Sequence, residues 1–299
     1  MWDVDHKLLY CPLYKVASGT WTTNFLRLAK YNEDLPKWQR FSKLHGASES
    51  VSRGMFPPPK SRKLQKQLLK ESTKFLVVRH PFDRIISAYT GKIANPMAKP
   101  RFYRDLQQDI VKEYREDQSD ESPPSFKEYI RYLLDLTDDI VKPGDWRAVD
   151  CVQAYYSVCA PCDVEYNMIL KLETHDEDTE FLIRKLELTE LMEPFTMWKH
   201  NSKGLNSIGE YDYYLYEEEW RNPVKMNREP VTETRETSED TLAAEMVSEE
   251  ERRRSEKSDY KRSLFSQLSR QEVQHLHDNY EIDFEMFGYD IQEFLEYAS

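Results

Sequence analysis

The sequence predicts an α/β fold in which one domain, spanning residues 1–299, is built on a central, mainly parallel sheet flanked by helices. Runs that are apolar on both faces, as buried parallel strands are, alternate with stretches of helical spacing. The chain has 299 residues, 39% of them hydrophobic, which is enough for one sizeable core. With only 15 Pro and 8 Gly, it is not a low-complexity chain.

The elements follow from local spacing. Ser18 or Thr20 is available as the N-cap of the first helix, and Ser266 or Ser269 as that of the C-terminal helix. In chain order the pattern predicts a strand at 7–14, a helix at 18–31, a basic amphipathic helix at 60–72, a central strand at 74–78, helices at 82–92, 101–116 and 122–136, a strand at 168–173, a helix at 177–188 and a helical segment at 268–290.

Charge is unevenly distributed along the chain. Residues 1–115 carry 22 Lys and Arg against 10 Asp and Glu, whereas the remainder carries 20 against 44. A basic first third indicates that this part of the chain meets anions, although a chance partition of paired surface charges gives the same count. The density of Lys and Arg in this part of the chain favours an acidic acceptor such as a polysaccharide, and we do not expect nucleic acid because no nucleic-acid-binding module is visible.

Residues 228–262 differ from the rest of the chain. Nineteen of these 35 residues are charged and seven are apolar or Tyr. Such a segment buries too little apolar surface to stay packed, so we interpret it as a mobile insertion within the domain or a solvated helix. No stretch approaches the ~20 apolar residues of a membrane span, and the chain begins with no signal-peptide pattern. We expect no membrane anchor in the chain as given.

Four cysteines are present, at positions 11, 151, 159 and 162. Three readings stay open: one or two disulfides, buried thiols, or a zinc site at C-x2-C. A second clean pair of zinc ligands is missing, so no metal is expected.

Two segments carry the chemistry, and the first is YKVASGTWTTNF at 14–25. A strand followed by a short loop of small residues and a helix leaves backbone N–H groups pointing outward, which is an anion site. The small side chains of Ala17, Ser18 and Gly19 let phosphate or sulfate oxygens approach, and Lys15 adds a positive charge. The order of residues is not that of a Walker A motif. The alternative is an ordinary capped helix.

The second segment is FLVVRHPFDRIISAY at 75–89. Arg79 ends the central strand, at the edge where α/β folds bind ligands, and its guanidinium suits bidentate contact with phosphate. Ser87 lies eight residues further on. The alternatives are a structural salt bridge from Arg79 to Asp83 and a packing role for Ser87.

These two segments, together with CVQAYYSVCAPCDVEYNMILKLET and the ending LSRQEVQHLHDNYEIDFEMFGYD, resemble the Golgi carbohydrate sulfotransferase family. That family includes the chondroitin and dermatan 4-O-sulfotransferases and the HNK-1 sulfotransferase. The resemblance implies a P-loop-like sulfotransferase domain in the Golgi lumen or at the Golgi membrane. It also implies transfer of a sulfo group from PAPS (3′-phosphoadenosine 5′-phosphosulfate) to a glycan hydroxyl. A glycosaminoglycan such as chondroitin or dermatan is favoured, at the 4-O position of GalNAc.

The resemblance also implies roles for individual residues. Arg79 and Ser87 would hold the 3′-phosphate of PAPS, with Arg84 nearby, and Lys15 would stabilise the bridging oxygen during transfer. The loop that binds the 5′-phosphosulfate would consist of Lys15, Val16, Ala17, Ser18, Gly19, Thr20 and Trp21.

A general base should take the proton of the acceptor hydroxyl, and His is the usual choice. His45 lies between the two donor segments and is our candidate, with Glu49 and His200 as alternatives. Two other functions are weighed against catalysis by sulfo transfer: a non-catalytic nucleotide- or glycan-binding relative, and a P-loop kinase, for which no acidic pair for magnesium stands out.

Overall fold

The computed structural model describes residues 1–31, 49–98, 101–136, 150–188, 252 and 255–299. The chain divides into two compact units, and each is described by itself. The first comprises residues 1–88, 135–200 and 278–289, and the second comprises residues 89–134, 201–277 and 290–299. The single domain expected over residues 1–299 stays a prediction.

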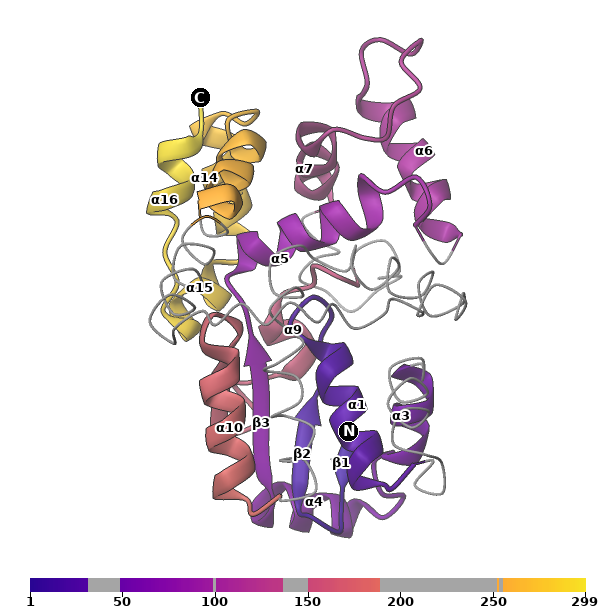
Figure 1. Ribbon diagram of the computed structural model, residues 1–299, viewed down its shortest axis with the longest axis vertical. Coiled ribbons are helices and arrows are strands. Elements are labelled where there is room, and N and C mark those ends of the chain that lie inside the picture. The colour runs from indigo at the N-terminus through magenta and orange to yellow at the C-terminus, as the bar shows by residue number, and fades with distance from the viewer. Residues whose placement is uncertain (32–48, 99–100, 137–149, 189–251, 253–254) are drawn as a thin grey trace, which may run out of the picture. The chain divides into compact units, whose positions relative to one another are not determined.

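The first unit contains a four-stranded sheet (Figure 1). Its strands, in spatial order, are β1 (Trp2–Asp3), β2 (Leu8–Cys11), β3 (Thr73–Val78) and β4 (Met168–Lys171). Strands β2, β3 and β4 are parallel, and β1 pairs antiparallel with β2. The predicted α/β fold with a mainly parallel sheet is therefore confirmed.

Helices α1 and α10 of this unit run alongside the strands (Figure 1). They follow β2 and β4 in the chain, as strand–helix alternation requires of a parallel sheet. The helices of the unit are α1 (Ser18–Leu28), α3 (Glu49–Met55), α4 (Arg62–Glu71), α5 (Pro81–Ala88), α9 (Tyr155–Cys159), the 3₁₀ turn Leu172–Thr174, α10 (His175–Lys185) and α15 (Glu281–Phe287).

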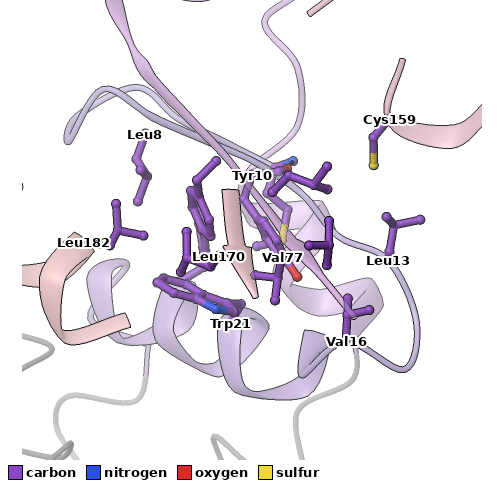
Figure 2. Packing of buried hydrophobic residues seen from close by; sticks show 14 of the residues in the cluster. Leu8, Tyr10, Leu13, Val16, Trp21, Val77, Cys159, Leu170 and Leu182 are labelled. Carbon is purple, nitrogen blue, oxygen red and sulfur yellow. Dashed lines mark hydrogen bonds between the residues drawn. The ribbon is translucent and has the colours of Figure 1, made fainter. Parts of the chain in front are cut away.

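The core of the first unit lies between the sheet and these helices (Figure 2). Residues 75–78 of β3 are fully buried, which explains why this strand is an unbroken apolar run. The ring of Phe75 lies 4.7 Å from that of Tyr10 and 4.5 Å from that of Trp21. Leu182 of α10 belongs to the same cluster. The aromatic packing anchors the first turns of α1 on the sheet.

A disulfide joins Cys11, at the end of β2, to Cys159, at the end of α9. It bridges 148 residues, and closing so long a loop limits the unfolded chain by an amount that typically stabilises a fold by about 2–4 kcal/mol. Of the other two cysteines, Cys151 is buried and Cys162 is exposed. Within the described residues no group of three or more His, Cys, Asp and Glu is placed to hold a metal ion.

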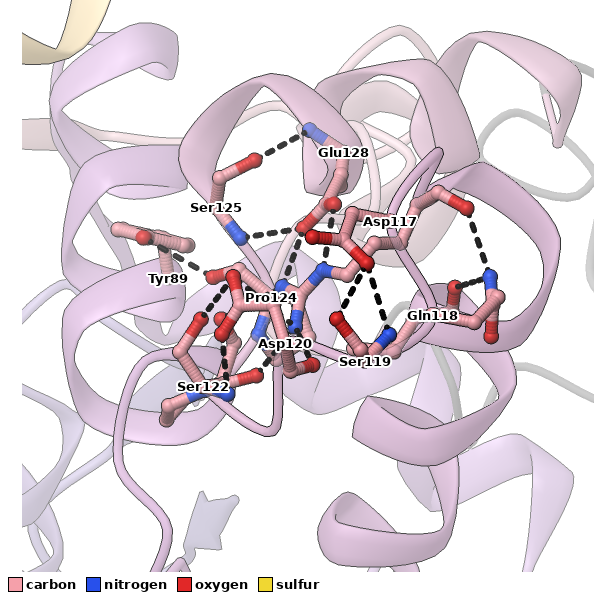
Figure 3. A network of polar contacts seen from close by, with 12 residues as sticks. Tyr89, Asp117, Gln118, Ser119, Asp120, Ser122, Pro124, Ser125 and Glu128 are labelled. Atoms are coloured by element: carbon pink, nitrogen blue, oxygen red, sulfur yellow. Dashed lines mark hydrogen bonds and ion pairs between the residues drawn. The ribbon is translucent and has the colours of Figure 1, made fainter.

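The second unit is helical where it is described. A network of polar contacts between Asp117 and Glu128 links two of its helices (Figure 3), and the side chain of Arg115 is largely buried within it. Arg115 binds the Glu128 carboxylate through Nε and Nη2, at 2.9 and 2.8 Å, and its Nη1 donates to the carbonyl oxygens of Asp120 and Ser122. The elements are the π-helix Tyr89–Ile93, α6 (Phe102–Tyr114), α7 (Phe126–Asp135), α14 (Arg270–Asp278) and α16 (Gln292–Tyr297).

Helices α7 and α14 begin with reciprocal caps. The Ser125 hydroxyl accepts the Glu128 N–H at 3.2 Å, and the Glu128 carboxylate accepts the Ser125 N–H at 2.7 Å. Ser269 and Glu272 repeat this arrangement, so of the two N-caps considered for the C-terminal helix Ser269 is confirmed.

Only the end of the charged segment 228–262 falls within the described residues. Residues 255–262 are helical and mostly exposed. Lys261 lies 3.7 Å from the Glu293 carboxylate and over the ring of Phe294, so this end packs within the second unit. Among the residues that the structure describes, no helix is long and apolar enough to cross a membrane.

Candidate functional site

Three loops meet at one edge of the sheet in the first unit. Because β2, β3 and β4 are parallel neighbours, the residues that follow them leave the sheet at the same edge. Contacts between the loops confirm this: Arg79 Nη1 donates to the Lys15 carbonyl oxygen at 3.4 Å, and the His80 N–H donates to Glu173 Oε1 at 3.0 Å. The structure thus brings together the two chemistry-bearing segments identified in the sequence.

The loop after β2 has an unusual backbone. Lys15 and Ala17 both adopt positive φ angles, 67° and 59°, in the left-handed region that residues with a Cβ rarely occupy. Such conformations are costly and collect at functional sites. Ala17 is the N-cap of α1 and makes no side-chain cap, so the expectation of Ser18 or Thr20 in that role is wrong. The first turn of α1 therefore begins at a residue whose side chain has no oxygen.

The first turn of α1 is also open to approach. A Cβ built on Gly19 meets nothing within 4 Å, so packing of the chain itself does not require glycine there. The first backbone bond of the helix is donated by the Trp21 N–H to the Ala17 carbonyl oxygen at 3.3 Å. The N–H groups of the residues before Trp21 precede that bond, and at a helix N-terminus such groups favour an anion.

The other loop residues divide between core and surface. Val16 and Trp21 are fully buried in the core cluster, so their side chains hold the loop and helix on the sheet. Lys15 is 8% exposed, whereas Ser18 and Thr20 are half-buried.

Three arginines hold successive parts of this loop by its carbonyl oxygens. Arg53 Nη2 donates to Pro12 at 3.3 Å, Arg84 Nε donates to Tyr14 at 3.0 Å, and Arg79 Nη1 donates to Lys15. Each guanidinium occupies a carbonyl that would otherwise repel an anion, and each adds positive charge beside the loop. The arginines therefore stabilise the loop in a form suited to a negatively charged ligand.

Arg84 is buried behind the loop. It is 1% exposed, its Nη1 donates to the Gln153 carbonyl oxygen at 2.5 Å, and its guanidinium lies 4.8 Å from the centre of the Tyr155 ring. Its Nη2 is buried and has no hydrogen-bond partner within the described part of the chain. These contacts support a role in holding the loop, and contact with a 3′-phosphate stays a prediction.

Arg79 is half-buried at the end of β3, and Tyr155 fixes its backbone. The Tyr155 hydroxyl accepts the Arg79 N–H at 2.9 Å and donates to the Arg79 carbonyl oxygen at 3.1 Å. Burial raises the pKa of Tyr155 to about 12, so the hydroxyl stays protonated at neutral pH.

Asp283, from α15, holds the start of α9. Its carboxylate accepts the N–H groups of Tyr155 and Tyr156 at 2.8 and 3.2 Å. Asp283 is fully buried, and burial raises the pKa of its carboxyl to about 6 against the opposing effect of these hydrogen bonds and of the Arg84 charge.

Of the three candidate general bases, the structure describes Glu49. His45 and His200 lie outside the described residues. Glu49 begins α3 and pairs with Arg53, and its charge acts on the hydroxyl of Tyr14, next to Lys15 in the chain. Burial, together with Glu49, raises the pKa of Tyr14 to about 12. Ser87 is half-buried in the last turn of α5, and its contact with a 3′-phosphate beside Arg79 stays a prediction.

The basic residues of α4 lie away from the candidate site. This helix ends at Glu71, just before β3 begins at Thr73, and it lies at the foot of the strands in Figure 1. The loops that hold Lys15 and Arg79 leave the opposite ends of the same strands. The positive charge of α4 therefore does not line the donor loops.

Sequence reasoning missed three residues that support the site: Arg53, Tyr155 and Asp283. Tyr155 and Asp283 fall within the segments CVQAYYSVC and YEIDFEMFGYD, which carry the family resemblance, yet neither pattern indicates a partner. Asp283 gave one signal, a lone acid inside an apolar helical face. Arg53 gave none, because arginine on a short helix is ordinary.

Comparisons with known proteins agree with this geometry. A family model described as the sulfotransferase family matches residues 1–209 and 195–290. Carbohydrate sulfotransferase 12 of Xenopus laevis is 33% identical over 217 residues, covering 64% of this chain and 49% of the relative. Carbohydrate sulfotransferase 11 of Rattus norvegicus is 28% identical over 192 residues (61% and 51%), and carbohydrate sulfotransferase 10 of Danio rerio 29% over 200 residues (62% and 52%).

The chain spans about half the length of the curated relatives it matches. No solved structure matches it significantly. The family model covers nearly the whole chain, including both loops of the candidate site and the segment around Asp283. On this evidence, the chain belongs to the sulfotransferase family.

Proposed function

We propose that the protein is a PAPS-dependent carbohydrate O-sulfotransferase. One observation carries the proposal: α1 begins without a side-chain cap, at a left-handed loop whose carbonyl at Lys15 is held by Arg79. That arrangement places a helix N-terminus and an arginine fork at one site, which suits a ligand with two separated anionic groups.

The residues fit such a donor. The start of α1, with open space beside Gly19, would hold the 5′-phosphosulfate. Arg79 and Ser87 would hold the 3′-phosphate, and Arg53 and Arg84 would keep the loop in place.

When bound, PAPS supplies the sulfo group and leaves as adenosine 3′,5′-bisphosphate. Lys15 is proposed to place its ammonium where negative charge builds on the leaving oxygen, and the N–H groups of α1 to hold the sulfo oxygens. His45 is proposed to take the proton of the acceptor hydroxyl, with Glu49 as the alternative beside Tyr14. Positioned charges of this kind account for most of the catalysis in related phosphoryl transfers.

For the acceptor, we propose a glycosaminoglycan such as chondroitin or dermatan, sulfated at the 4-O position of GalNAc. The support is the resemblance of the four segments to enzymes with that activity. We also propose the Golgi lumen as the compartment, since the disulfide between Cys11 and Cys159 belongs in an oxidising environment.

A transfer assay tests this proposal. Labelled sulfo donor is incubated with the protein and with desulfated chondroitin, dermatan or heparan, and the products are analysed as disaccharides. Label at the 4-O position of GalNAc is the expected result. Label on heparan alone contradicts the acceptor, and binding of PAPS without transfer to any glycan favours the non-catalytic relative.

A further inference from the structure

The backbone of Arg79 depends on one hydroxyl. The N–H of Arg79 donates to the Tyr155 hydroxyl, and the same hydroxyl donates to the Arg79 carbonyl oxygen. The register of β3 with β4 ends at Val78, so Arg79 lies just beyond the ladder. Its direction at the edge of the sheet is therefore set by Tyr155.

Tyr155 is itself held from several sides. Its ring packs edge-on against Phe287 of α15 at 5.2 Å and lies under the guanidinium of Arg84. Its N–H is bonded to Asp283. Solvent reaches neither Tyr155 nor Asp283, because both side chains are completely buried.

The segment before Tyr155 is fixed in the same way. The Tyr280 hydroxyl donates to the Val152 carbonyl oxygen at 2.7 Å, and Arg84 donates to that of Gln153. Helix α9 has no side-chain cap of its own at Ala154, so Asp283 takes that role from a distant part of the chain. The contacts form a continuous series from α15 through α9 to Arg79 and on to Lys15.

We propose that Tyr155, held by Asp283, is a positioning residue that aims Arg79 at the 3′-phosphate of the donor and keeps the Lys15 loop closed against it. The inference rests on the proposed function, since it concerns how that donor is recognised. Tyr155 touches no donor atom in this account: it acts through Arg79. The expected consequence is a loss of selectivity for the 3′-phosphate rather than a general loss of folding.

The test compares Tyr155→Phe with Tyr156→Phe. The first variant removes the hydroxyl that bonds Arg79 and keeps the ring, and the second makes the same chemical change at the neighbouring residue. Calorimetry measures the affinity of the full chain for adenosine 3′,5′-bisphosphate and for adenosine 5′-monophosphate, which lacks the 3′-phosphate. Hydrogen exchange of the loop at residues 13–20 is measured without ligand, and thermal unfolding monitors the fold.

In Tyr155→Phe, the preference for the bisphosphate should fall about three- to tenfold, as expected when a neutral hydrogen bond is lost. Exchange in the loop should rise, because Arg79 holds Lys15 less firmly. Tyr156→Phe should change neither. Asp283→Asn should act in the same direction, because it weakens the hold on Tyr155 while keeping the shape of the side chain.

Two results overturn the inference: an unchanged preference in Tyr155→Phe, or loop exchange equal to that of the wild type. If the wild type shows no preference for the bisphosphate, the donor assignment of the proposed function fails. The exchange measurement then still decides whether Tyr155 positions the loop through Arg79.

Discussion

Two helices of the first unit both begin at an alanine, left-handed in α1 and extended in α9, and they differ in what lies at their N-termini. Both α1 and α9 have alanine at the N-cap, Ala17 and Ala154, and neither alanine supplies a cap. At α9 the Asp283 carboxylate accepts two backbone N–H groups. At α1 the contacts of the described residues include no such carboxylate. The start of α9 shows a carboxylate filling an uncapped helix N-terminus, and the proposed function assigns the start of α1 to an anionic ligand.

The protein places a carboxylate of its own at one of these helix starts and arginines at the other. Asp283 is fully buried to complete α9, although burial opposes its charge. The loop before α1 instead collects three arginines on its carbonyl oxygens. A carboxylate of the protein therefore fills the start of α9, whereas arginine side chains surround the loop before α1.

The largest loss of activity is expected from a change at the proposed general base, which faces the acceptor. His45→Ala should lower kcat by about 10²–10⁴-fold, as expected when a general base is lost, with affinity for the donor nearly unchanged. The wild-type rate should fall as pH drops through the histidine pKa, and the variant should lose that limb. Steady-state kinetics over pH measures both.

His275→Ala is the control, since His275 is an exposed residue of α14. Near-wild-type turnover in His45→Ala would identify His45 as a bystander and move attention to Glu49, which lies beside Tyr14, and to His200.

A smaller loss of activity is expected from Lys15→Ala, in the loop before α1. An interaction made chiefly in the transition state appears in the rate, so kcat should fall by about 10²–10³-fold while the affinity for adenosine 3′,5′-bisphosphate changes much less. Lys30→Ala, at another left-handed but exposed lysine, should change neither quantity. If Lys15→Ala keeps its turnover, the phosphosulfate loop is misplaced.

The sequence predicts the elements of the candidate site better than the contacts that hold them together. The strand, loop and helix around Lys15, and Arg79 at the end of β3, follow from local apolar runs and small residues. The left-handed conformation of Ala17 does not follow from such patterns. Nor do the arginine contacts, because they join residues up to 70 positions apart. Asp283 bonds Tyr155 across 128 positions, and no periodicity encodes such a pairing.

The buried acid at α9 predicts a change in stability with pH. Burial raises the folded-state pKa of Asp283 to about 6, above the ordinary aspartate value of 3.8. The folded state therefore binds more protons in this window, and stability is lost as pH rises from about 3.8 to about 6. The loss attributable to this group amounts to about 3 kcal/mol, to order of magnitude.

Asp283→Asn should remove this part of the pH dependence. The free energy of unfolding of the variant, relative to that of the wild type, should therefore increase as pH rises from 4 to 7. Denaturant unfolding at several pH values measures the difference. Glu281→Gln, an exposed change on the same helix, should leave the pH profile of the wild type intact. Parallel profiles for the wild type and Asp283→Asn would show that Asp283 does not titrate in this range.

A smaller effect separates capped from uncapped helices. Ser125→Ala removes a reciprocal cap with Glu128 and should lower the free energy of unfolding by about 1 kcal/mol. Ser18→Ala, at the start of α1, should change stability by less than about 0.5 kcal/mol, since Ser18 is not the N-cap. Equal losses in the two variants would mean that Ser18 caps α1 after all.

Donor binding at the start of α1 is tested most directly by calorimetry on the wild-type protein, with two nucleotides that differ only at the 5′ position. Adenosine 3′,5′-bisphosphate should bind at the start of α1 and at Arg79, whereas adenosine 3′-monophosphate offers nothing to α1. Removing the 5′-phosphate should weaken binding by about tenfold or more, the cost of charge-assisted hydrogen bonds. Equal affinity for the two ligands would contradict the claim that the uncapped start of α1 binds the donor.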